Sequence, residues 1–219
     1  MRNNKLIVFD LDDTLYNEVD FLYSAYEEIA KSIDVSHWES LLGMMLEMWR
    51  KGDDVFLNLE NLYPHVATKP SLLSMYRSHK PTIVLSETAK MVLSDLRQRE
   101  IPMGIITDGR SVTQRNKYLA LGLYEYIPEH NLIISEETGR SKLEPFNFLI
   151  FMNRYPTFDY IYVGDNPCKD FVVANRLEWK TFGLKDTGRN IHSQAEPVDV
   201  DFRPRYWLDS IEGILGYLD

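Results

Sequence analysis

Three aspartates stand close together near the start of the chain, directly after a short apolar run. The run Leu6-Ile7-Val8-Phe9 leads into Asp10, and Asp12 and Asp13 follow. Carboxylates this close repel one another, which is costly unless a cation or a shared proton compensates their charge. An apolar run of this length is typical of a buried strand of a parallel sheet. Because ligands bind at the carboxyl ends of such strands, the spacing predicts a site for a hard cation and catalysis by carboxylate.

Three more polar groups occur where other expected strands end or helices begin. Thr107-Asp108-Gly109 ends an apolar stretch, and Lys142 precedes a helix expected to begin near Pro145. The run from Gly164 to Asp170, which includes Asp165, follows another apolar stretch. Since the carboxyl ends of parallel strands lie at one edge of a sheet, we expect these groups to lie near Asp10.

The elements that must position these residues alternate between strand and helix from about residue 84 onward. The expected strands are 5–10, 102–107, 132–135, 159–164, 180–183 and a short edge strand at 207–208. The expected helices of this part are 86–99, 111–121, 145–154, 168–176 and 210–218. This alternation predicts an α/β fold, a doubly wound parallel sheet with right-handed crossovers and a Rossmann-like core.

Residues 16–81 have only helical periodicity and separate the first strand from the others. Three apolar faces with helical spacing predict helices around 22–33, 38–49 and 72–76. We therefore expect a catalytic core formed by residues 1–15 and 82–219, and a helical cap formed by 16–81. The residues where the cap leaves the core could line a pocket or simply pack in the hinge. They are Tyr16, Asn17, Glu18 and Phe21.

The stretch 185–205 is polar and rich in turn-forming residues. About twenty residues without regular structure are unusual in a compact domain. We expect a surface loop here, with a flap at the site, an extension of the sheet edge or an oligomer contact as the alternatives.

Composition narrows the function classes. The chain has 219 residues and a net charge of −9, which argues against nucleic acid as the main partner. It has no apolar run near the ~20 residues of a membrane span, and the run before Asp10 is too short for a signal peptide. The single cysteine, Cys168, excludes an internal disulfide, so we expect a cytoplasmic protein and interpret Cys168 as a packing residue. The five histidines lack metal-ligand spacing, and monomer is the default oligomeric state.

Taken in order, the four polar groups resemble the four motifs of the haloacid dehalogenase-like (HAD) hydrolase superfamily. The sequence has DxDxT at 10–14, a threonine at 107, a lysine at 142 and GDxxxxD at 164–170. The place of the insertion matches the C1-type helical cap of that superfamily. One departure is that the family usually has proline directly after the lysine, whereas Leu143-Glu144 intervenes here; Arg140 is the alternative cation.

The resemblance implies a role for each motif. Asp10 would be the nucleophile that forms an aspartyl-phosphate, and Asp12 the general acid and base. Mg²⁺ would be the cofactor, bound by Asp10, Asp165 and the backbone carbonyl of Asp12, with Asp170 in or near its coordination shell. The phosphoryl group would be bound by Thr107, Asp108, Gly109 and Lys142. We expect Asp13 to be structural or solvent-facing and Thr14 to brace the loop by hydrogen bonds.

The reaction expected from this resemblance is hydrolysis of a small phosphate monoester by a Mg²⁺-dependent phosphatase. Dehalogenases of the superfamily lack the acid–base aspartate that Asp12 supplies here. The partner would be a small phosphorylated metabolite of the phosphoglycolate, sugar phosphate or nucleoside monophosphate class, with no nucleic acid or membrane. The alternatives are a phosphomutase or phosphotransferase of the same superfamily, or a non-catalytic binding module on this fold.

Overall fold

The protein is built around a parallel sheet, as seen in a computed structural model that describes residues 4–195 and 197–218. The sheet has six strands in the order β3-β2-β1-β4-β5-β6, and every neighbouring pair is parallel. The strands are β1 (Lys5–Phe9), β2 (Met103–Thr107), β3 (Leu132–Ile134), β4 (Asp159–Gly164), β5 (Lys180–Leu184) and β6 (Tyr206–Leu208). The chain leaves β1 first toward β2 and later returns on its other side at β4. This order confirms the doubly wound α/β fold.

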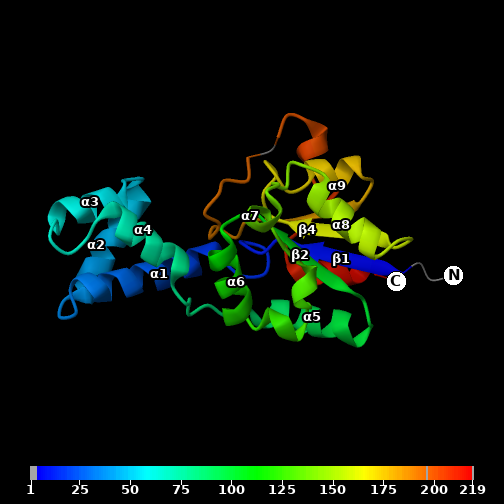
Figure 1. Ribbon diagram of the computed structural model, residues 1–219. Helices are drawn as coiled ribbons and strands as arrows, with labels where there is room; N and C mark the ends of the chain where they lie inside the picture. The colour runs from blue at the N-terminus through cyan, green and yellow to red at the C-terminus, as the bar shows by residue number, and fades with distance from the viewer. Residues whose placement is uncertain (1–3, 196, 219) are drawn as a thin grey trace.

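Both faces of the sheet are covered, which explains the continuous apolar run of β1. Ile7 and Phe9 belong to one buried cluster, and Leu6 and Val8 to another, because successive side chains of a strand point to opposite faces. The first face is covered by α5 (Glu87–Gln98), α6 (Ser111–Ala120) and the 3₁₀ segment η4 (Ile211–Tyr217). The other is covered by α8 (Phe146–Arg154) and α9 (Val172–Arg176), as Figure 1 shows. The sequence predicted a final helix over 210–218, and the structure has the 3₁₀ helix η4 there.

The first four helices after β1 lie beside the sheet and have their own apolar cluster (Figure 1). They are α1 (Glu18–Ile33), α2 (Trp38–Lys51), α3 (Val55–Leu62) and α4 (Lys69–Ser78). The sequence predicted three helices in this segment, and α3 was missed. It has only eight residues and is capped by Asp54, whose side chain accepts a hydrogen bond from the backbone N–H of Leu57 at 3.1 Å.

Short elements connect the rest of the described chain. They are the 3₁₀ turns η1 (Leu123–Glu125), η2 (Glu129–Asn131) and η3 (Val200–Phe202), and the single helical turn α7 (Ser135–Thr138). Among the helices of residues 4–195 and 197–218, none combines the length and the apolar character that crossing a bilayer requires.

Candidate active site

The polar groups singled out in the sequence meet at the carboxyl edge of three neighbouring strands. Asp10 follows β1, Thr107 ends β2 and Asp165 follows β4, and β1 pairs with both other strands. A cavity of about 170 Å³ opens between them. It is lined by Asp10, Asp12, Asp13, Glu18, Thr107, Asp108, Asp165, Asn166, Lys169 and His192. Every lining side chain is polar, so the cavity suits a small, hydrophilic ligand.

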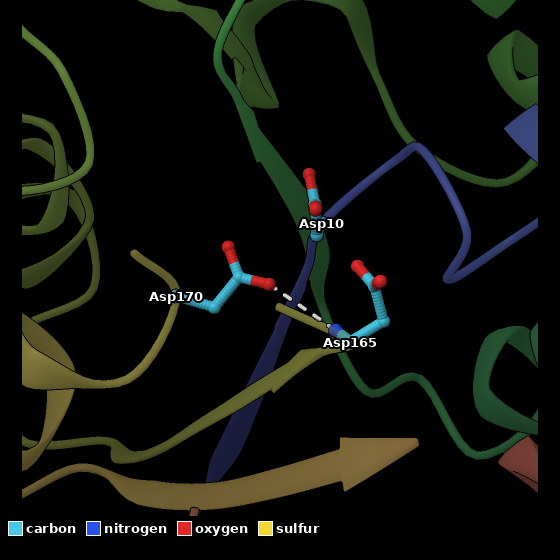
Figure 2. A group of neighbouring side chains, drawn as sticks. All are labelled: Asp10, Asp165 and Asp170. Atoms are coloured by element: carbon cyan, nitrogen blue, oxygen red, sulfur yellow. Dashed lines mark hydrogen bonds between the residues drawn. The ribbon is translucent and has the colours of Figure 1, made fainter. Parts of the chain in front are cut away.

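Three buried aspartates form a group that can hold a metal ion. Asp10, Asp165 and Asp170 each offer a carboxylate oxygen, and these oxygens lie within 4.8 Å of one another (Figure 2). Carboxylate oxygens are the ligands that Mg²⁺ prefers. Lys142 is the ammonium group paired with this cluster, so three ionised carboxylates retain an excess negative charge that a divalent cation would neutralise. The donor set therefore fits Mg²⁺.

Asp10 has one oxygen engaged and one available. Its Oδ1 accepts hydrogen bonds from the backbone N–H of Leu11 at 2.7 Å and from Lys142 Nζ at 2.5 Å. Its Oδ2 makes no hydrogen bond to the described residues. Burial raises the pKa of Asp10 to about 7, while the charge of Lys142 opposes the rise. Because Asp10 lines the cavity, this second oxygen is available to a ligand there.

Lys142 is buried completely between two carboxylates. Its Nζ lies 2.5 Å from Asp10 Oδ1 and 2.9 Å from Asp170 Oδ1. Burial alone would lower the pKa of Lys142, but the two carboxylates raise it above its ordinary value, so the side chain stays charged. The backbone N–H of Lys142 donates to Asp108 Oδ1 at 3.1 Å, which fixes the loop. Arg140, the alternative cation, is exposed and pairs with Glu144 instead.

Asp170 orients the loop that follows β4. Its Oδ2 accepts hydrogen bonds from the backbone N–H groups of Asp165 at 3.1 Å and Asn166 at 2.8 Å, and Figure 2 shows the first of these. Its Oδ1 accepts from Lys142. Because both oxygens are engaged, Asp170 is better suited to positioning Asp165 than to serving as a freely available ligand.

The segment 185–195 is part of the site. Asn190 Nδ2 donates to Asp165 Oδ2 at 2.8 Å, and Gln194 Nε2 donates to the Asp165 carbonyl at 2.7 Å. Burial, and then the charges of Asp10 and Asp170, raise the pKa of Asp165 to about 9. Residues 185–189 are exposed, which agrees with the expected surface loop, and the contacts of Asn190 and Gln194 agree with the alternative of a flap at the site. His192 from this segment lines the cavity.

Asp13 joins this segment to the start of the helical insertion. Its Oδ1 accepts from the backbone N–H of Glu18 at 2.8 Å, and its Oδ2 accepts from that of Ile191 at 3.1 Å. These bonds hold Asp13 at a φ of 53°, in the left-handed region. The neighbouring Thr14 does not brace the loop as expected, because its buried Oγ1 makes no hydrogen bond within the described residues.

Asp12 is held by Tyr16, one of the hinge residues noted in the sequence, and by Lys117 and Gln114, which sequence reasoning missed. Its Oδ1 accepts from Lys117 Nζ at 2.6 Å and from the Tyr16 hydroxyl at 2.5 Å, and its Oδ2 accepts from Gln114 Nε2 at 2.8 Å. Gln114 also donates to Thr107 Oγ1 at 2.6 Å. Burial favours the neutral acid, but the charge and hydrogen bond of Lys117 outweigh it and lower the pKa of Asp12.

The other residues considered in the sequence differ in their exposure and in whether they reach the cavity. Glu18 lines the cavity, and burial followed by the charge of Asp12 raises its pKa to about 8. Phe21 is buried in the apolar core, which agrees with the packing alternative. Asn17 precedes α1 and is partly exposed. Cys168 is exposed, so its interpretation as a packing residue is wrong.

Comparison with known proteins agrees with this site. The model of the haloacid dehalogenase-like hydrolases matches residues 7–184. A protein of Methanocaldococcus jannaschii named glyceraldehyde 3-phosphate phosphatase is 30% identical over 228 residues, covering 96% of this chain and 95% of its own. A protein of the same name from Methanopyrus kandleri is 25% identical over 232 residues, covering 94% and 93%.

Solved structures share the fold. YfnB of Bacillus subtilis, a HAD hydrolase bound to magnesium, superposes with a TM-score of 0.68 at 20% identity and covers 99% of both chains. A HAD phosphatase of Thermococcus onnurineus superposes with a TM-score of 0.62 at 19% identity, covering 98% of this chain and 97% of its own. With the family match and the named relatives, the chain belongs to the haloacid dehalogenase-like hydrolases and is a phosphatase that hydrolyses phosphoric monoesters.

Proposed function

We propose that this phosphatase transfers the phosphoryl group of its substrate to Asp10 and then to water. The observation that supports this is the state of the Asp10 carboxylate, which lines the cavity and has one oxygen fixed by Leu11 and Lys142 and the other without a hydrogen bond to the described residues. Attack of the free oxygen on phosphorus forms an aspartyl-phosphate as the bond to the leaving alcohol breaks. The charge of Lys142, which is buried behind Asp10, would offset the negative charge of the phosphoryl group. Thr107, which lines the cavity, would donate a hydrogen bond to a phosphoryl oxygen.

Asp12 is the proposed acid and base. Its protonated form, which is the minor form because Lys117 lowers the pKa of Asp12, gives a proton to the oxygen of the leaving alcohol in the first step. In the second step it takes a proton from the water that attacks the aspartyl-phosphate, which releases inorganic phosphate and restores Asp10. Its contacts with Lys117 and Gln114 keep the carboxylate beside the cavity, within the reach that proton transfer needs.

Mg²⁺ is the proposed cofactor. Asp10 and Asp165 would hold it with the backbone carbonyl of Asp12, and Asp170 would orient Asp165. The ion would supply positive charge that offsets the phosphoryl oxygens. The excess of carboxylates over Lys142 supports a divalent cation at this place.

A triose phosphate, glyceraldehyde 3-phosphate in the first instance, is the proposed substrate. A cavity of about 170 Å³ is small beside the ~300–1,000 Å³ of sites for larger ligands. Its polar lining suits the hydroxyl and carbonyl groups of a short sugar phosphate better than a nucleobase, which requires an apolar or stacking wall. The relatives from Methanocaldococcus jannaschii and Methanopyrus kandleri are both named after glyceraldehyde 3-phosphate. We also propose that residues 16–81 act as a cap over this cavity, because Glu18 at their start lines it.

Release of inorganic phosphate from a panel of esters, with Mg²⁺ and with a chelator, tests the proposal. We expect turnover of glyceraldehyde 3-phosphate above that of phosphoglycolate and nucleoside monophosphates, and loss of turnover with the chelator. Asp10→Asn should lower kcat about a thousandfold or more, whereas the matched control Asp53→Asn, on the exposed surface, should not. Activity that survives Asp10→Asn would exclude the aspartyl-phosphate. Phosphate transferred to an alcohol instead of water would favour a phosphotransferase.

A further inference from the structure

Lys117 is a buried lysine for which the four motifs provide no role. It lies on α6, and its side chain is only 3% exposed. A buried ammonium group is costly unless it is paired. Its Nζ lies 2.6 Å from Asp12 Oδ1 and 3.9 Å from Glu18 Oε1. The lysine is therefore placed where its charge acts on the proposed acid–base residue.

Two aromatic rings complete the surroundings of the ammonium group. Nζ lies 4.3 Å from the centroid of the Phe21 ring and 5.9 Å from that of Tyr16. Ring faces attract a cation at these distances, and more strongly where water is excluded. Because these contacts approach from several sides, Lys117 has little freedom to point elsewhere.

The contacts of Asp12 show which of its oxygens is left for the reaction. Oδ1 accepts from both Lys117 and the Tyr16 hydroxyl, whereas among residues 4–195 and 197–218 Oδ2 accepts from Gln114 alone. Each carboxylate oxygen can accept about two hydrogen bonds, so Oδ1 is filled and Oδ2 keeps one position. Gln114 also donates to Thr107, which ties the plane of the carboxylate to the proposed phosphoryl site.

We propose that Lys117 is a positioning residue that fixes the Asp12 carboxylate so that Oδ2 faces the oxygen of the leaving alcohol. The inference rests on the proposed roles of Asp10 and Asp12. Lys117 touches neither the substrate nor the phosphorus and acts through Asp12 alone. Glu18 and Phe21 belong to the first turns of α1, so the lysine also joins the acid–base residue to the start of the helical insertion.

The test compares two esters that differ in their need for an acid. The alkoxide that leaves from glyceraldehyde 3-phosphate must be protonated, whereas nitrophenolate leaves 4-nitrophenyl phosphate as a stable anion. The constant kcat/KM reports the steps from free enzyme and ester up to formation of the aspartyl-phosphate. In these steps the two esters differ in whether their leaving group needs a proton. In Lys117→Met, we expect kcat/KM to fall about a hundredfold for the alkyl ester and less than about tenfold for the aryl ester.

A second variant covers the case in which Lys117→Met does not fold. Tyr16→Phe removes only the hydroxyl that binds the same oxygen of Asp12, and should lower kcat/KM for the alkyl ester about threefold to tenfold, with little effect on the aryl ester. Lys117→Arg keeps the positive charge and should recover at least tenfold of the loss in Lys117→Met. The control Lys51→Met replaces an exposed lysine of α2 and should change neither ester.

Each outcome bears on a separate statement. Equal losses on both esters, or no loss on either, in the folded variants would overturn the positioning role of Lys117. If the wild-type enzyme with Mg²⁺ hydrolyses neither ester, the proposed function fails instead. Asp12 is also the proposed base in hydrolysis of the aspartyl-phosphate, a step that both substrates share. Where that step limits turnover, the Lys117 variant should therefore lower kcat at saturation for both esters.

Discussion

The stabilisation of the protein by Mg²⁺ should increase with pH. Burial raises the pKa of Asp10 to about 7 and that of Asp165 to about 9, against an ordinary value of 3.8. Between pH 4 and these values, the folded metal-free protein holds protons that the unfolded chain has released. The metal-free protein therefore loses stability as pH rises through this range. A metal ion binds the ionised carboxylates, so it must displace these protons.

The size of the effect follows from the number of protons displaced. Between pH 7 and 9 Asp165 is the proposed ligand that holds a proton, so affinity should rise about tenfold per pH unit, equivalent to about 1.4 kcal/mol. Below pH 7 Asp10 holds a second proton, and the slope should approach about 2.7 kcal/mol per pH unit. These slopes apply where the Mg²⁺ concentration exceeds the dissociation constant.

Thermal unfolding from pH 6 to 9, with a chelator and at a fixed Mg²⁺ concentration, measures the stability of the metal-free protein and the stabilisation by Mg²⁺ at each pH. Asp165→Asn should remove most of the slope between pH 7 and 9, whereas Asp53→Asn, on the exposed surface, should leave it unchanged. Stabilisation by Mg²⁺ that is constant with pH, or larger at pH 6 than at pH 9, would refute the assignment of the ion to these buried carboxylates.

Three substitutions test the packing around the site. Lys142→Met leaves the carboxylates of Asp10 and Asp170 without their cation, so the metal-free protein should lose about 3–5 kcal/mol of unfolding free energy at pH 8 in a denaturant titration. Gly164→Ala would place a Cβ 2.5 Å from Asp170 Oδ2, and should cost about 1–3 kcal/mol and reduce the thermal shift caused by Mg²⁺. Burial lowers the pKa of His79 below 6.5, so its contribution to stability is lost as pH falls below that value; His79→Phe should flatten this decline, by at most about 1.4 kcal/mol per pH unit.

The sheet and the meeting of distant aspartates could be predicted because both follow from local patterns. A run such as Leu6–Phe9 predicts a strand buried on both faces, and strand–helix alternation predicts parallel neighbours. Once β1 and β4 are adjacent, Asp10 and Asp165 must come together even though most of the chain separates them. The structure brings them together, and their chemical roles remain predictions.

The partners of Asp12 could not be predicted in the same way. Gln114 and Lys117 are three residues apart on α6, a helix whose polar sequence is typical of a solvent-exposed surface. Both are nevertheless buried, because α6 packs against α4 and the Lys117 side chain lies over the Phe21 ring. A polar residue type does not reveal such burial. The sequence gives one signal of their role, which is two long polar side chains spaced three residues apart on the helix that follows Thr107.

The contacts of the segment 185–195 could not be predicted for a different reason. Its position is set by single hydrogen bonds to residues far away in sequence, such as Ile191 N–H to Asp13 and Asn190 to Asp165. Turn-forming residues predict that the chain bends, but they carry no information about what the bend contacts. Because neither apolar periodicity nor regular structure specifies this segment, only the folded arrangement shows that it reaches the site.

Two contacts that could not be predicted from the sequence involve the start of α1. Lys117 of α6 contacts Asp12 and Glu18, and Arg189 of the segment 185–195 pairs with Asp20 at 2.6 Å. The exposed Arg189 pair contributes less than about 1 kcal/mol, whereas breaking the buried Lys117 pair costs several kcal/mol. Displacement of α1 can therefore release Arg189 easily but must disturb Lys117 and, through it, the carboxylate of Asp12. The position of the helical insertion and the geometry of the acid–base residue are thus linked through Lys117, in addition to the hydrogen bonds of Tyr16 with Asp12 and of Glu18 with Asp13.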